Sequence, residues 1–147
     1  MELTGSSLLL LADGRRARLF EERLRGGPLT EITDRLGDLA AEAPVASGSG
    51  GRVRDRMGRA SHTTGGPGPH EKREEAFVSR VGARAAEEMR RGDYRDLILV
   101  AAPRALGQLR RIMDGEGLSI ALAEPHDRLT QTPESLRESL RELRRRS

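Results

Sequence analysis

Two short, continuous apolar runs set the strongest limit on how this chain can fold. They are the stretch LLLLA at 8–12 and the stretch LILVAA at 97–102. Each run has the length of a strand and lacks alternating polar positions, which is typical of a strand covered on both faces. We therefore expect the two runs to lie at the centre of a sheet that has helices on both of its faces.

An antiparallel meander is predicted at the start of the chain. The pair Asp13-Gly14 separates predicted strands at 6–12 and 15–22, and this dipeptide readily adopts the positive φ angles of a tight hairpin turn. After a glycine-rich turn, the stretch LTEITDRL at 29–36 shows a broken alternation that suits an exposed third strand.

Helix and strand patterns alternate in the second half of the chain. Apolar residues at helical spacing predict helices at about 71–91, after Pro103 and after Thr132. The stretch LSIALAEP at 118–125 predicts a fifth strand, which the second of these helices joins to the strand at 96–103. Such a connection is expected to form a right-handed parallel crossover.

Together these patterns predict an α/β fold. Its mixed five-stranded sheet has the order 3-2-1-4-5, an antiparallel meander followed by a parallel βαβ unit, and helices on both faces. Ribonuclease H-like folds have this strand order, but their nucleases need carboxylates near the central strands to hold divalent metals. The first central strand offers only leucines there, Asp96 lies at the wrong end of the other, and Asp13 is expected to form the turn.

Composition limits the available classes of function. The chain has 147 residues and no cysteine, so we expect one domain over 1–147 without disulfides or a thiol nucleophile. No apolar run approaches the roughly 20 residues that span a bilayer, and the first residues lack the features of a secretory signal. We therefore expect a cytoplasmic protein without membrane insertion. His62, His70 and His126 do not share a helical i, i+4 spacing, so neither a metal site nor a cofactor is predicted.

The stretch at about 37–69 is predicted to be a long loop rich in glycine and arginine. The centre of this stretch contains four closely spaced arginines and a single aspartate. The arginines are Arg52, Arg54, Arg56 and Arg59. Arginine is well suited to gripping phosphate, although only three aromatic residues are present, which argues against a base-stacking platform. An irregular stretch of this length is usually functional or disordered, and a solvated linker is the alternative.

Several stretches in their common order resemble a known family. They are LLLLADGRRARLFE, DRMGRASH, HEKREEAFVSRVGARAAEEM, DLILVAAPRALGQLR and EPHDRLTQTPESLRESL. Together they resemble the bacterial host attachment family, whose members are known as proteins required for attachment to host cells. The resemblance runs from about residue 6 to residue 140. Members of that family resemble the middle domain of archaeal and eukaryotic class 1 peptide-chain release factors, which is akin to ribonuclease H.

The release-factor resemblance implies a role for the stretch GGPGPH at 65–70. Release factors carry a Gly-Gly-Gln tip on a long loop just before a helix, and this tip positions water for ester hydrolysis. Gly65 and Gly66 occupy a similar place here, but Pro67 stands where glutamine is expected and has neither the amide side chain nor a backbone N–H. His70 is the nearest side chain that could handle a proton.

We therefore expect a non-catalytic binding protein that associates with RNA or the ribosome through its arginine and glycine loop. The residues assigned to RNA or partner binding are Arg52, Arg54, Arg56, Arg59, Gly65, Gly66 and His70. One alternative is an intracellular interaction or regulatory protein for host attachment that does not bind nucleic acid. A second alternative is a release-factor-like ester hydrolase, for which no residue set supplies a convincing mechanism.

Overall fold

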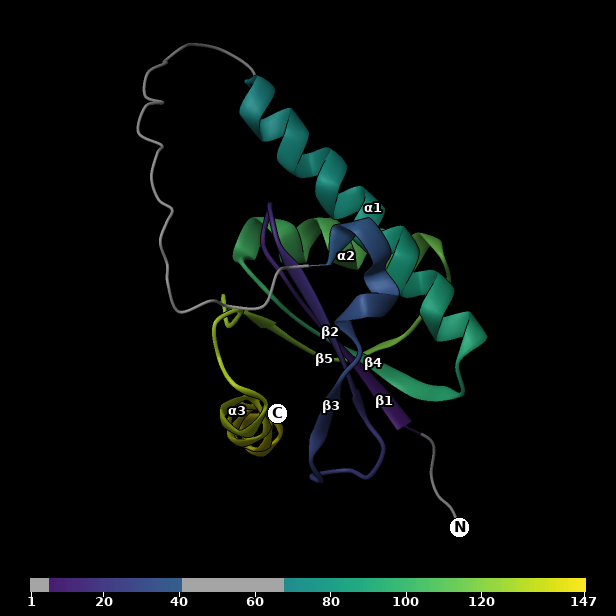
Figure 1. Cartoon of the computed structure of the whole chain (residues 1–147), viewed down its shortest axis with the longest axis vertical. Coiled ribbons are helices and arrows are strands. Elements are labelled where there is room, and N and C mark those ends of the chain that lie inside the picture. The colour runs from purple at the N-terminus through teal and green to yellow at the C-terminus, as the bar shows by residue number, and fades with distance from the viewer. Residues whose placement is uncertain (1–5, 41–67) are drawn as a thin grey trace.

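A mixed five-stranded sheet forms the centre of the protein (Figure 1). The computed structural model describes residues 6–40 and 68–147. The strands are β1 (Ser6–Ala12), β2 (Ala17–Glu22), β3 (Leu29–Glu31), β4 (Tyr94–Ala101) and β5 (Ile120–Pro125). Their spatial order is β3-β2-β1-β4-β5, with β1 antiparallel to β2 and parallel to β4. The predicted mixed sheet, its strand order and its combination of antiparallel and parallel pairs are confirmed.

Helices cover both faces of the sheet. The helical elements are the 3₁₀ helix η1 (Thr33–Leu39) and the α-helices α1 (Pro69–Arg91), α2 (Pro103–Gly115) and α3 (Pro133–Arg146). The helices α1 and α2 pack on one face, and α3 packs on the opposite face (Figure 1). Within the described residues, no helix has both the length and the apolar character needed to cross a membrane.

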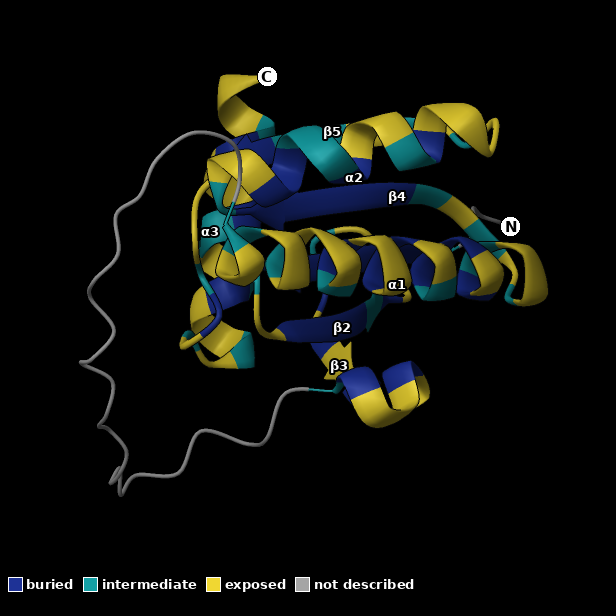
Figure 2. Cartoon of the chain, turned by 90° about the horizontal axis from the view of Figure 1, so that it is seen from above, coloured by how far each residue is buried: buried dark blue, intermediate teal, exposed yellow. Residues whose placement is uncertain are grey.

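The central strand β1 supplies side chains to both faces. Leu8 and Leu10 enter the core beneath α1 and α2, whereas Leu9 and Leu11 enter the core beneath α3. Each of these four side chains is at most 1% exposed. In Figure 2 most of the neighbouring strands β2 and β4 is likewise dark blue, while the outward faces of the helices are exposed. The pattern explains why an uninterrupted leucine run is compatible with a strand.

The first turn differs from the tight turn expected from Asp13-Gly14. It spans residues 13–16, the second strand begins at Ala17, and Gly14 does not have a positive φ. The Asp13 carboxylate instead accepts hydrogen bonds from the backbone N–H groups of Arg15 and Arg16, both at 2.7 Å. Such a local bond stabilises a longer turn, because the aspartate side chain substitutes for a backbone partner.

The third strand is shorter than the expected stretch at 29–36. It ends at Glu31, and η1 follows. Thr33 ends the pairing with β2, because its hydroxyl accepts the N–H of Leu19 at 2.9 Å. The side chain thus takes the backbone donor that a further strand residue would have paired, while the carbonyl of Leu19 accepts the N–H of Ile32 at 2.8 Å.

The predicted loop at 37–69 has different limits in the structure. Its first residues belong to η1, and α1 begins at Pro69 rather than at residue 71. Gly68 precedes the helix as its N-cap, and its N–H donates to the carboxylate of Glu71 at 3.3 Å. Proline suits the first helical position, since its missing N–H would have no partner inside the helix.

The helices α1 and α2 run in parallel and approach closely at Gly82. Arg104 near the start of α2 contacts Glu71 near the start of α1, while Arg90 and Glu116 pair at the opposite ends. A Cβ atom on Gly82 would lie 2.8 Å from Cδ1 of Ile112, which is closer than carbon atoms normally approach. The glycine therefore sets the distance between the two helices.

We expect Gly82→Val to lower the free energy of unfolding by about 1–3 kcal/mol, because the added methyl groups overpack this helix contact. Gly107→Val is the matched control within α2, since a Cβ atom at that position would meet only a side-chain nitrogen at 4.0 Å. Urea denaturation of both variants measures the difference. Equal stability of the two variants would show that Gly82 does not limit the packing of the helices.

A buried carboxylate on β5 joins the last strand to the C-terminal segment. Glu124 accepts hydrogen bonds from Arg128 at 2.8 and 3.1 Å and from Arg146 at 3.1 Å. The hydrogen bond from Arg128 lowers the pKa of Glu124 below its ordinary value of 4.5, despite the opposing effect of burial. This carboxylate consequently stabilises the folded state while it is ionised.

Glu124→Gln should therefore lower the free energy of unfolding at pH 7, by about 1–3 kcal/mol for charge-assisted hydrogen bonds. Because the folded-state pKa is depressed, the contribution is present above pH 4.5 and is lost as the pH falls through the folded-state pKa. The gap between the variant and the unaltered protein should narrow accordingly. Denaturation curves from pH 7 to pH 3 test this, with the exposed Glu138→Gln as the control. A gap independent of pH would contradict it.

Candidate binding site at the starts of α1 and α2

A pocket of about 110 Å³ lies between α1 and α2, next to the first hairpin turn. It is lined by Gly14, Glu71, Glu74, Glu75, Val78, Ala102, Arg104, Ala105 and Gln108. The carboxyl ends of β1 and β4 meet here, since the N–H of Ala102 donates to the carbonyl of Ala12 at 3.1 Å. Open α/β sheets commonly bind ligands outside the carboxyl ends of their strands.

The local sequence brings the three walls of the pocket together. Pro69 and Pro103 occupy the first turns of α1 and α2, and the parallel course of the helices places both starts at the same edge of the sheet. The hairpin turn contacts α1 at Gly14, where a Cβ atom would lie 2.7 Å from Cδ of Glu74 and would require the end of that side chain to move. Gly14 does not have a positive φ.

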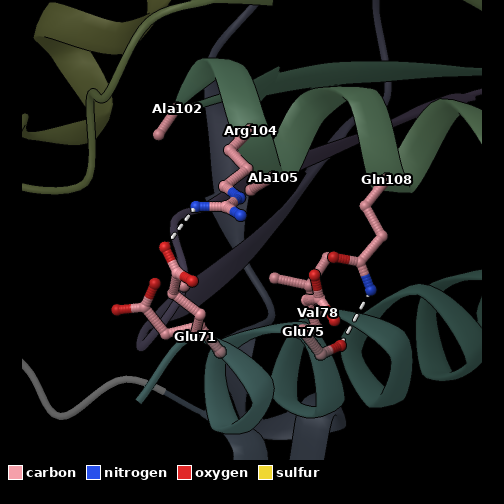
Figure 3. Close-up of a pocket in the computed structure, with 9 residues that line it drawn as sticks. Glu71, Glu75, Val78, Ala102, Arg104, Ala105 and Gln108 are labelled. Carbon is pink, nitrogen blue, oxygen red and sulfur yellow. Dashed lines mark hydrogen bonds and ion pairs between the residues drawn. The ribbon is translucent and has the colours of Figure 1, made fainter. Parts of the chain in front are cut away.

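Polar side chains of α1 and α2 meet across the pocket (Figure 3). Arg104 donates to the carboxylate of Glu71 at 3.1 Å. The side-chain amide of Gln108 donates to the backbone carbonyl of Glu75 at 2.8 Å and to the hydroxyl of Ser79 at 3.0 Å. A carbonyl can only accept, so the amide nitrogen of Gln108 must face α1, and its carbonyl oxygen remains an acceptor.

His70 lies beside this pocket and contacts the hairpin turn. Its Nε2 atom is 3.1 Å from Nη2 of Arg15 and 3.3 Å from a carboxylate oxygen of Glu74. A neutral Nε2 accepts from the arginine, whereas a protonated Nε2 donates to the glutamate, so one nitrogen cannot satisfy both contacts. In the described residues, no hydrogen bond joins His70 to a serine or threonine hydroxyl.

The chain matches a recognised family over most of its length. The family model for proteins required for attachment to host cells matches residues 8–140, which extend from β1 into α3. The chain belongs to this host attachment family. A search of curated proteins found no match. Family membership confirms the resemblance that the sequence suggested and connects the protein with host attachment.

Most of the predicted site residues of this host attachment family member lie outside the described residues. They are Arg52, Arg54, Arg56, Arg59, Gly65 and Gly66. His70 lies within the described part, in the first turn of α1. In the chain, Gly65 precedes the N-cap residue Gly68 by three positions. The predicted binding segment therefore joins the described fold directly beside the pocket.

The pocket itself was missed by sequence reasoning. Glu71, Glu75, Arg104 and Gln108 follow two helix starts that the sequence did indicate, but their meeting depends on the parallel packing of those helices. The available signal was a pair of prolines, each at the start of a helix that connects strands of the same sheet. Among the described residues, no group of three or more His, Asp or Glu side chains is placed to hold a metal ion.

Positive charge near the pocket is largely neutralised within the fold. Arg104 pairs with Glu71, and Arg15 pairs with Glu74 at 3.5 Å. Segment 41–67, in contrast, contains four arginines and only two acidic residues. Its net charge of +2 is most of the +3 carried by the whole chain.

Proposed function

We propose that this host attachment family member is a non-catalytic, cytoplasmic binding protein that associates with RNA through segment 41–67, ribosomal RNA included. Family membership supports a role related to host attachment. The association with RNA rests on one observation, which is the distribution of positive charge. The arginines beside the pocket face carboxylates, whereas those of the segment outnumber its acidic residues.

Phosphate binding favours arginines whose donors are not already used. The guanidinium group donates in a planar fork that matches two phosphate oxygens. An arginine held by a carboxylate must give up that partner before it can bind phosphate, and this exchange lowers its net contribution. Arg52, Arg54, Arg56 and Arg59 have only Asp55 as an acidic neighbour in the sequence. Gly65 and Gly66 would additionally permit a close approach of backbone to RNA.

Replacing Arg52, Arg54, Arg56 and Arg59 together by alanine should weaken binding to a labelled single-stranded RNA. Each lost phosphate contact should make the negative slope of log K against log salt shallower by about 0.7, so the loss of four contacts amounts to about 3. Fluorescence anisotropy over a series of salt concentrations measures both the affinity and the slope.

A second quadruple variant separates the effect of location from that of net charge. Arg80, Arg90, Arg141 and Arg145 are exposed on helices and paired with carboxylates, so their replacement by alanine removes the same charge. This control variant should keep most of the RNA affinity. An equal loss in both variants, or no binding by the unaltered protein at low salt, would refute a specific role for the segment.

Ester hydrolysis in the manner of release factors is a second candidate, because His70 contacts a carboxylate that could hold its ring. The Nε2 atom of His70 lies 3.3 Å from Glu74. A hydrolytic site additionally needs a group that orients water at the glycine tip, and Pro67 lacks both the amide side chain and the N–H. The binding role therefore remains the better supported proposal.

We accordingly expect the purified protein to release no peptide from peptidyl-tRNA on ribosomes above background. His70→Ala should give the same result, and it should leave RNA affinity nearly unchanged because the histidine ring already contacts Arg15 and Glu74. Release of labelled peptide is the direct measurement, with a release factor as the positive control. Robust release that disappears in His70→Ala would establish catalysis and contradict the binding proposal.

A further inference from the structure

We infer that the pocket between α1 and α2 receives an arginine side chain from a basic segment of a protein partner. This inference is independent of the proposed RNA association, because it concerns a different surface and a ligand of opposite charge. It rests on the hydrogen-bonding capacity of the pocket walls, on the apolar floor and on the room that the pocket provides.

The pocket walls present mainly acceptors. Glu75 contributes a carboxylate that forms no ion pair within the described residues, and the side-chain carbonyl of Gln108 is left as an acceptor. The nearby Arg104 donates to Glu71. A ligand that brings N–H donors and positive charge would satisfy these groups, whereas a phosphate would meet three carboxylates on α1.

The floor of the pocket is apolar. Val78 and Ala105 are buried there, at 2% and 3% exposed, and Ala102 lies next to them. A volume of about 110 Å³ can hold several groups of the size of water. These features suit a side chain that has methylene groups behind a charged head, since long basic side chains pack their stems on apolar surface.

Arginine fits the pocket better than lysine. Its planar guanidinium can donate to a carboxylate and to a neighbouring carbonyl at the same time, whereas an ammonium group is a compact point charge. The acceptors of Glu75 and Gln108 come from different helices, so a guanidinium group that donates to both of them matches the pocket. Glu71 and Glu74 are 40% and 32% exposed, which leaves the carboxylate side of the pocket accessible to another molecule.

A short peptide with one central arginine flanked by glycines provides the test. Titration into the full-length protein should shift the methyl NMR signals of Val78 and Ala105 in a saturable manner, without shifting those of Leu140 on the opposite face of the sheet. Replacing the arginine by citrulline keeps the shape and removes the charge. The citrulline peptide should bind about tenfold more weakly or worse, as expected for a lost charge-assisted hydrogen bond.

Glu75→Gln is the informative variant, because the side chain is exposed and the substitution should not affect folding. It should weaken binding of the arginine peptide about three- to tenfold. Glu87→Gln is the matched control, since Glu87 lies on the same helix, is 71% exposed and does not line the pocket. This control should leave the affinity unchanged.

Four results would overturn the inference. The first is the absence of saturable shifts at millimolar peptide, the second is equal binding of the arginine and citrulline peptides, and the third is an unchanged affinity in Glu75→Gln. The fourth is binding that occurs only after all four arginines at 52, 54, 56 and 59 are replaced, which would make the chain's own segment the occupant. None of these results depends on RNA, so the inference and the proposed function can fail separately.

Discussion

Burial of the leucine run of β1 on both faces of the sheet is the constraint on which the rest of the structure depends. Leu8 and Leu10 require one apolar layer, and Leu9 and Leu11 require another. A helix or a pair of helices must therefore cover each face. Since α1 leads into β4 and α2 leads out of it on the same face, the two helices run in parallel and both begin near the carboxyl end of β1. The pocket between them is a geometric consequence of how this strand is buried.

Buried charged side chains connect the outer elements to this centre. Glu22 of β2, which is 2% exposed, accepts two hydrogen bonds from Arg144 of α3 at 2.7 and 2.8 Å. Arg18 similarly donates to two backbone carbonyls of the segment before α3, both at 2.8 Å. Loss of one partner would leave a buried charge without compensation, which is costly. The basic isoelectric point of the sequence, about 10.4, therefore does not by itself indicate binding of acidic partners, because part of the arginine content is used inside the fold.

The sheet order and the helices could be predicted because apolar periodicity records burial directly. The local hydrogen bonds between side chains and the backbone were not predicted. The Asp13 carboxylate lengthens the first turn, and the Thr33 hydroxyl ends the third strand, because a side chain competes with the backbone at each position. The pocket escaped for another reason, since it needs Glu75 and Gln108 from helices whose separation Gly82 sets. Periodicity identifies the buried face of each helix but does not give the distance between two helices.

The two proposed sites would select ligands of opposite charge although they adjoin each other in the chain. Carboxylates of Glu71, Glu74 and Glu75 lie close to the point where segment 41–67 joins α1. Charges within about 8 Å of one another are only partly screened at physiological salt, so these carboxylates oppose phosphate near the start of the helix. A guanidinium bound in the pocket would neutralise part of that negative charge and thereby favour RNA. Since coupling between two binding equilibria is reciprocal, bound RNA would favour the basic partner by the same factor.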